Sequence, residues 1–141
     1  NGELVTDELG NTATTTENNN VTSELQSYEE NVYENEASVA DKKESFYENG
    51  QKKTEANYIN GKLNGPMTLW NENGKKLIQI SYKEDIRHGL LTRWYANGQK
   101  KVEINYNEGQ RDGVMTFWNE NGDIKKTLIY VNGKIVKKES S

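Results

Sequence analysis

The sequence predicts a mainly β protein: an elongated antiparallel sheet of β-hairpin repeats, preceded by an N-terminal helix. The first observation is a period, because Trp70, Trp94 and Trp118 recur every 24 residues and Phe46 takes the same position one period earlier. A fixed period without insertions is typical of repeat architectures. The second observation is composition. Only 32% of the residues are hydrophobic, which favours a thin, extended structure over a thick globular core.

Two kinds of turn punctuate each 24-residue unit. An Asn-Gly pair follows each of the four aromatic residues, at Asn49-Gly50, Asn73-Gly74, Asn97-Gly98 and Asn121-Gly122. Such a pair supplies the positive φ angles that a hairpin turn requires. A second turn follows each periodic tyrosine, at Asn60-Gly61, Glu84-Asp85, Glu108-Gly109 and Asn132-Gly133. Each unit is therefore predicted to be a hairpin with a turn at both ends.

The strands between these turns alternate in polarity. In one unit we expect strands at 67–70 and 78–82, and on the second of these Ile78, Ile80 and Tyr82 share one apolar face. Isolated hairpins are marginal in water, so the units should pair edge to edge into one antiparallel meander. The four predicted units span residues 46–69, 70–93, 94–117 and 118–141.

The N-terminal third differs in composition from the repeats. Residues 1–22 are rich in Asn, Thr and Glu, which predicts a flexible acidic tail. In residues 23–45, Leu25, Tyr28, Val32 and Val39 have spacings of 3, 4 and 7, which predict an amphipathic helix. Its apolar stripe needs a surface to cover, and we expect that surface to be the repeat sheet.

Charge divides the chain in the same way. Residues 1–45 contain eleven acidic and two basic residues, a net charge of −9, whereas residues 46–141 carry a net charge of +5. The chain contains no cysteine, so it has neither a disulfide framework nor a thiol nucleophile. It starts at Asn1 without an initiator Met, so we expect that upstream residues have been removed, and the sequence leaves open whether these were a signal peptide or a lipoprotein leader. The compartment is left open as well, with the cell envelope or secretion preferred over the cytoplasm.

The repeat unit resembles the MORN repeat family, and more closely the bacterial variant found in proteins described as antitoxin components. The resemblance rests on segments 46–50, 70–74, 94–98 and 118–122, together with the later Tyr and Gly positions. It implies a hairpin-based β sheet that acts as a binding module or scaffold, with protein or phospholipid partners. Asp85 departs from the pattern, and so does the last unit, where Lys137-Lys138 suggests an incomplete cap.

The sequence offers no candidate for catalysis. His88 is the only histidine, and its position holds Asn64 or Asp112 in other units, as expected for a polar turn residue. There is no Ser-His-Asp set, no metal-ligand cluster and no phosphate-binding loop in its expected context. We therefore predict no catalytic residues, no metal, no cofactor and no enzymatic activity.

The periodic aromatic residues are the leading candidates for binding a protein or peptide partner. They are expected to form a ladder along one face, although they can instead fill the thin core of the sheet. These residues are Trp70, Trp94, Trp118, Tyr58, Tyr82, Tyr106 and Tyr130. The alternative is attachment to anionic lipid through repeat lysines. These lysines are Lys52, Lys76, Lys100, Lys101 and Lys125. Nucleic acid is not expected, because the sequence pI is about 5.2.

Overall fold

The computed structural model describes residues 4–6, 12–14 and 37–141, in two compact units divided after Ala37. In the first unit, β1 (Leu4–Thr6) and β2 (Thr12–Thr14) pair antiparallel, with Val5 opposite Ala13. The other residues of the predicted flexible tail, 1–22, lie outside the described residues. The same holds for residues 23–36 of the predicted helix.

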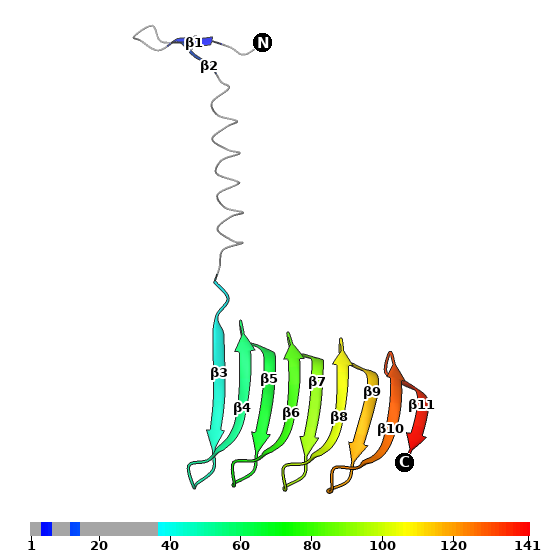
Figure 1. The fold of residues 1–141 in the computed structure, drawn as a ribbon. Coiled ribbons are helices and arrows are strands. Elements are labelled where there is room, and N and C mark those ends of the chain that lie inside the picture. Colours follow the sequence, from blue (N-terminus) through cyan, green and yellow to red (C-terminus); the bar gives the residue numbers. More distant parts are fainter. Residues whose placement is uncertain (1–3, 7–11, 15–36) are drawn as a thin grey trace. The chain divides into compact units, whose positions relative to one another are not determined.

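The second unit is a nine-stranded antiparallel sheet in which each strand pairs with its neighbours in sequence (Figure 1). The predicted meander of hairpin repeats is thereby confirmed. Its strands are β3 (Ala40–Phe46), β4 (Lys52–Ile59), β5 (Lys62–Trp70), β6 (Lys76–Lys83), β7 (Ile86–Trp94), β8 (Lys100–Asn107), β9 (Gln110–Trp118), β10 (Ile124–Val131) and β11 (Lys134–Ser140). In the part of the chain that the structure describes, no helix is long and apolar enough to cross a bilayer.

Both predicted kinds of turn are present. The two-residue turns have positive φ at both positions, as at Asn60 (51°) and Gly61 (79°), which matches the twist of the flanking strands. The Asn-Gly turns are longer and are closed by side chains as well as by the backbone. In one of them the Asn71 side-chain oxygen accepts hydrogen bonds from the backbone N–H groups of Asn73 and Lys75, both at 3.0 Å. The turns thus fix the hairpins locally.

The predicted helix over residues 23–45 is wrong at its C-terminal end, because residues 40–45 belong to strand β3. This strand pairs with β4 along its whole length, with Lys43 opposite Ala56 and Glu44 opposite Glu55. The sequence of β3 shows no apolar alternation. As an edge strand with almost all of its side chains exposed, β3 buries neither face and does not need apolar residues at alternate positions. Pairing with β4 determines its conformation, so the repeat sheet starts one strand earlier than predicted.

The register separates the side chains into two faces, since directly paired residues share a face and successive residues alternate. We call one side the apolar face. Its central row comprises Ala56, Met67, Ile80, Leu91, Ile104, Met115 and Leu128. We call the other side the polar face. Its central row comprises Glu44, Glu55, Thr68, Gln79, Thr92, Glu103, Thr116, Thr127 and Glu139.

The core of this thin sheet lies on the apolar face. Ile104 is only 1% exposed, and Tyr106 and Tyr130 pack in the same cluster. Half-buried Leu91, Met115 and Leu128 pack against the cluster. The apolar alternation predicted for the second strand of each unit is therefore confirmed. The tight packing is centred on β8.

Candidate binding site

One row of aromatic and lysine side chains crosses the polar face near the Asn-Gly turns. Trp70 lies two positions after Thr68 on β5, so alternation places both side chains on the polar face. The register pairs Phe46 with Lys52, Trp70 with Lys76, and Trp94 with Lys100. We call this set the Trp–Lys row. It consists of Phe46, Lys52, Trp70, Lys76, Trp94, Lys100 and Trp118.

Each lysine of the Trp–Lys row contacts the aromatic ring of the next hairpin. The ammonium nitrogens of Lys52, Lys76 and Lys100 lie 5.6, 5.9 and 5.8 Å from the ring centroids of Trp70, Trp94 and Trp118, respectively. These are cation–π distances, worth about 0.5–1 kcal/mol each at exposed sites. The three tryptophans and three of the candidate lysines thus belong to one arrangement that links successive hairpins.

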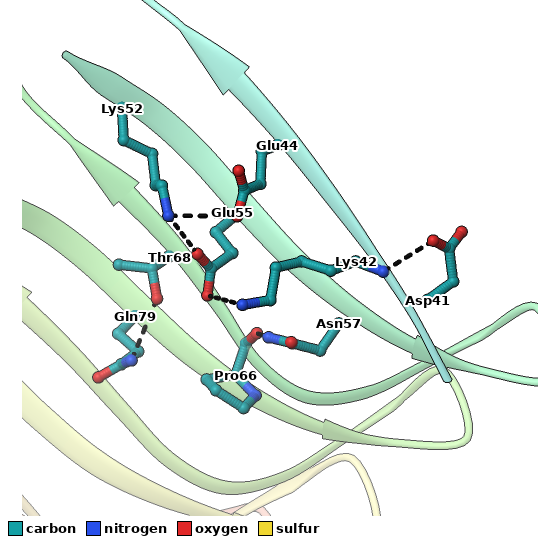
Figure 2. A network of polar contacts seen from close by, with 9 residues as sticks. All are labelled: Asp41, Lys42, Glu44, Lys52, Glu55, Asn57, Pro66, Thr68 and Gln79. Carbon is teal, nitrogen blue, oxygen red and sulfur yellow. Dashed lines mark hydrogen bonds and ion pairs between the residues drawn. The ribbon is translucent and has the colours of Figure 1, made fainter. Parts of the chain in front are cut away.

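Carboxylates neutralise part of this row. Lys52 forms ion pairs with Glu55 at 2.7 Å and Glu44 at 3.2 Å, and Figure 2 shows this network beside the Lys42–Glu55 pair and the Gln79–Thr68 hydrogen bond. The hydrogen bond from Lys52 lowers the pKa of Glu55 below its usual value. Lys100 repeats the contact with Glu103, at 2.6 Å. Two of the lysines are therefore already paired with acids.

A groove lies beside the end of the Trp–Lys row. Trp94, Trp118 and Lys100 line it together with residues of the third and fourth Asn-Gly turns, and its volume is about 390 Å³. Both indoles are half-buried. These tryptophans therefore combine packing between hairpins with a partly open surface.

A second row of aromatic and cationic side chains crosses the apolar face at the opposite ends of the strands. The register pairs Tyr82 with Arg87, and Tyr106 with both Gly89 and Arg111. Tyr130 pairs with Gly113. We call this set the Tyr–Arg row. It consists of Tyr82, Arg87, Tyr106, Arg111 and Tyr130.

Each arginine of the Tyr–Arg row is held between two tyrosines. The guanidinium carbons of Arg87 and Arg111 lie 5.4 and 5.3 Å from the ring centroids of Tyr106 and Tyr130. Arg111 also donates hydrogen bonds to the hydroxyls of Tyr130 at 3.1 Å and Tyr106 at 3.5 Å. Hydrogen bonding to Tyr82 raises the pKa of Arg87, and hydrogen bonding to Tyr106 raises that of Arg111. Both guanidinium groups remain exposed to solvent and charged.

The predicted aromatic ladder is thus two separate surfaces. Trp70, Trp94 and Trp118 lie on the polar face, whereas the four tyrosines lie on the apolar face. Tyr106 and Tyr130 are 7% and 5% exposed, so they support the apolar face from within. Tyr58 and Tyr82 are half-buried and remain open to contact.

The two other candidate lysines lie apart from the Trp–Lys row. The ammonium of Lys101 lies 5.3 Å from the ring centroid of Tyr95, in the third Asn-Gly turn. Lys125 is exposed on β10 and lines a second groove of about 480 Å³ with Tyr95 and Ser141. The five lysines therefore do not form one continuous patch.

His88 and Glu108 form a polar contact at the surface, outside these rows. The Nδ1 atom of His88 lies 3.5 Å from a carboxylate oxygen of Glu108, whose side chain is 69% exposed. Within residues 4–6, 12–14 and 37–141, no group of three or more His, Asp and Glu side chains is arranged to hold a metal ion.

Comparison with known families identifies the repeat. The family model described as the MORN repeat variant matches residues 42–60, 63–84, 87–108 and 111–132. None of the curated proteins compared with the chain matches it significantly. The matches cover more than half of the 141 residues. Each match begins within the first strand of a hairpin and ends one residue after its second strand. Repeats of this kind commonly serve as binding modules. The chain belongs to the MORN repeat variant family.

Proposed function

We propose that this protein is a non-enzymatic binding module that takes a protein or peptide partner on the apolar face of its sheet. The observation that carries the proposal is that this face remains partly open. Met67 is 37% exposed, and Ile80, Leu91, Met115 and Leu128 are only half-buried. Aromatic and aliphatic side chains of this kind supply large contact areas in protein interfaces.

The proposal predicts that partner capture depends on one face only. Met67→Glu places a charge on the apolar face, and the matched control Leu90→Glu places one on the polar face, where Leu90 is 46% exposed and pairs with Asn105. We expect partners that the wild-type chain captures in affinity purification to be lost with Met67→Glu and retained with Leu90→Glu. Both variants should keep the far-UV circular dichroism spectrum of the wild type.

The opposite pattern would contradict the proposal. If Leu90→Glu abolishes capture and Met67→Glu does not, the partner lies on the polar face. An antitoxin-like role is one form of protein binding and requires a toxin among the captured partners; its support is the family resemblance alone.

Peripheral attachment to anionic lipid is a second proposal, supported by the alignment of Lys52, Lys76 and Lys100 in one row. The ion pairs of Lys52 and Lys100 reduce the charge available to lipid. We therefore expect little co-sedimentation with vesicles of phosphatidylserine and phosphatidylcholine at physiological salt, and Lys76→Gln should reduce whatever binding occurs at low salt. Strong binding that is insensitive to Lys76→Gln would place the lipid contact elsewhere on the protein.

A further inference from the structure

Among the described residues, the cations of the apolar face form no ion pair with an acidic side chain. This face carries six basic side chains, Lys43, Arg87, Arg93, Arg111, Lys126 and Lys138, and one acidic side chain, Asp41. In the described residues, every ion pair lies on the polar face or at its turns. The apolar face is therefore both hydrophobic and positively charged.

Aromatic rings take the place of carboxylates around four of these six cations. Lys43 and Lys126 lie 4.7 and 4.5 Å from the ring centroids of Tyr58 and Phe117, in the same manner as the two arginines of the Tyr–Arg row. A ring positions a guanidinium group without neutralising it, so its outer N–H donors stay available. Arginine presented in this way is suited to bidentate contact with a carboxylate.

We propose that the apolar face binds an acidic amphipathic helix of a partner protein, with Arg87 and Arg111 as the carboxylate-recognition residues. This inference rests on the proposed function and names the chemistry of the partner. The apolar side of the helix packs on the central row of the face at Ile80, Leu91 and Met115. Its acidic side faces the Tyr–Arg row.

The spacing of the two arginines specifies the helix further. Arg87 lies on β7 and Arg111 on β9, two strands apart, which corresponds to about 9.6 Å in a sheet. A helix rises about 10.5 Å over seven residues, and positions i and i+7 lie on nearly the same side. A helix that crosses the strands therefore meets both arginines with carboxylates seven residues apart. An extended segment covers the same distance in about three residues, which places the two side chains on opposite sides.

The test uses three peptides of about 20 residues, long enough to be helical in water. The first has a leucine stripe and Glu at positions i and i+7. The second replaces both Glu with Gln, and the third moves the second Glu to i+9, half a turn away around the helix. Binding to the full chain is measured by fluorescence anisotropy at low and high salt.

We expect the first peptide to bind most tightly and to lose affinity as salt increases. Arg87→Gln and Arg111→Gln should each weaken it about tenfold, as for the loss of one charge-assisted contact. Lys137→Gln on the polar face is the matched control and should leave the affinity unchanged. Both arginines are exposed, so the variants should keep the wild-type melting temperature to within a few degrees, about the effect of a surface substitution.

Each other outcome overturns a distinct part of the inference. Equal binding of the Glu and Gln peptides removes acid recognition and leaves the apolar face as a docking surface. Equal binding of the i+7 and i+9 peptides shows that the two carboxylates need not lie on the same side of a helix. If no peptide binds while partner capture still depends on Met67, the acidic helix is not the partner and the proposed function stands. If no peptide binds and partner capture is also independent of Met67, the acidic helix and the proposed function are both wrong.

The acidic N-terminal residues of the chain are the remaining competitor for the same face. Residues 1–36 contain nine acidic and no basic residues. A full-length variant with Gln or Asn at these nine positions should bind the first peptide with nearly wild-type affinity. A gain of about tenfold or more would show that the chain occupies its own apolar face, and would overturn the assignment to a partner.

Discussion

Replacing Ile104 with alanine should lower the free energy of unfolding by about 3 kcal/mol, within the range of about 2–5 kcal/mol for truncation of a buried Ile. Ile104 is 1% exposed and lies in the cluster with Tyr106 and Tyr130. The thin sheet has little other core to compensate for the cavity. The measurement is urea unfolding followed by far-UV circular dichroism, with a lower midpoint and an unchanged slope.

Val114→Ala is the matched control for this prediction. Val114 is 55% exposed and neighbours Met115 on the same strand, but its side chain lies on the polar face. Its truncation should change the free energy of unfolding by no more than about 0.5 kcal/mol. If both variants lose the same stability, the core is not concentrated on the apolar face around Ile104.

The importance of Ile104 was only partly predictable from the sequence. The 24-residue period and the turn residues predict the hairpins, the meander and the apolar alternation of Val102, Ile104 and Tyr106. The period treats Ala56, Ile80, Ile104 and Leu128 as equivalent positions. Their burial nevertheless differs, since Ala56 and Ile104 are 7% and 1% exposed whereas Ile80 and Leu128 are half-buried. Ile104 belongs to the core cluster with Tyr106 and Tyr130, and Leu128 packs against that cluster from its edge.

The separation of tryptophans and tyrosines onto opposite faces follows from alternation and from the register of the strands. Met67 on β5 pairs with Ile80 on β6, and both lie on the apolar face. Trp70 lies three residues after Met67 and Tyr82 lies two residues after Ile80, so alternation puts the indole on the polar face and the phenol on the apolar face. The sequence shows two alternating strands, but it does not show which of their residues pair. The expected single aromatic ladder therefore became two rows.

The edge strand and the arginines were missed for another reason. The period of the aromatic residues starts at Phe46, and β3 lies before it with a charged sequence that only pairing with β4 explains. Arg87 and Arg111 occupy a position that is Leu63 in the first repeat and has no equivalent arginine in the last. A search for residues shared by all units overlooks such partial repetition. The available signal was their position two residues before Gly89 and Gly113.

Replacing these two glycines with alanine should destabilise the protein by different amounts, because Gly89 and Gly113 have similar backbone angles and different surroundings. Gly89 has φ of +98° and Gly113 has φ of +87°, values that L residues rarely adopt. A Cβ atom at Gly89 would lie 3.2 Å from the Cβ of Ser81, whereas one at Gly113 would have no heavy atom within 4 Å. Gly113→Ala should therefore cost about 1–2 kcal/mol for backbone strain alone. Gly89→Ala should cost about 1 kcal/mol more because of the close contact.

Thermal and urea unfolding of the two variants separate the steric cost from the backbone cost. Adding Ser81→Gly to Gly89→Ala removes the close contact, so a double-mutant cycle should show a favourable coupling of about 1 kcal/mol. The same Ser81→Gly change combined with Gly113→Ala should show no coupling, since Ser81 and Gly113 lie in different repeats. Equal losses for Gly89→Ala and Gly113→Ala would mean that β6 and β7 move apart to admit the methyl group. Arg87 pairs with Tyr82 across the same two strands. The Tyr–Arg row would then be easier to deform than the regular pairing of its strands suggests.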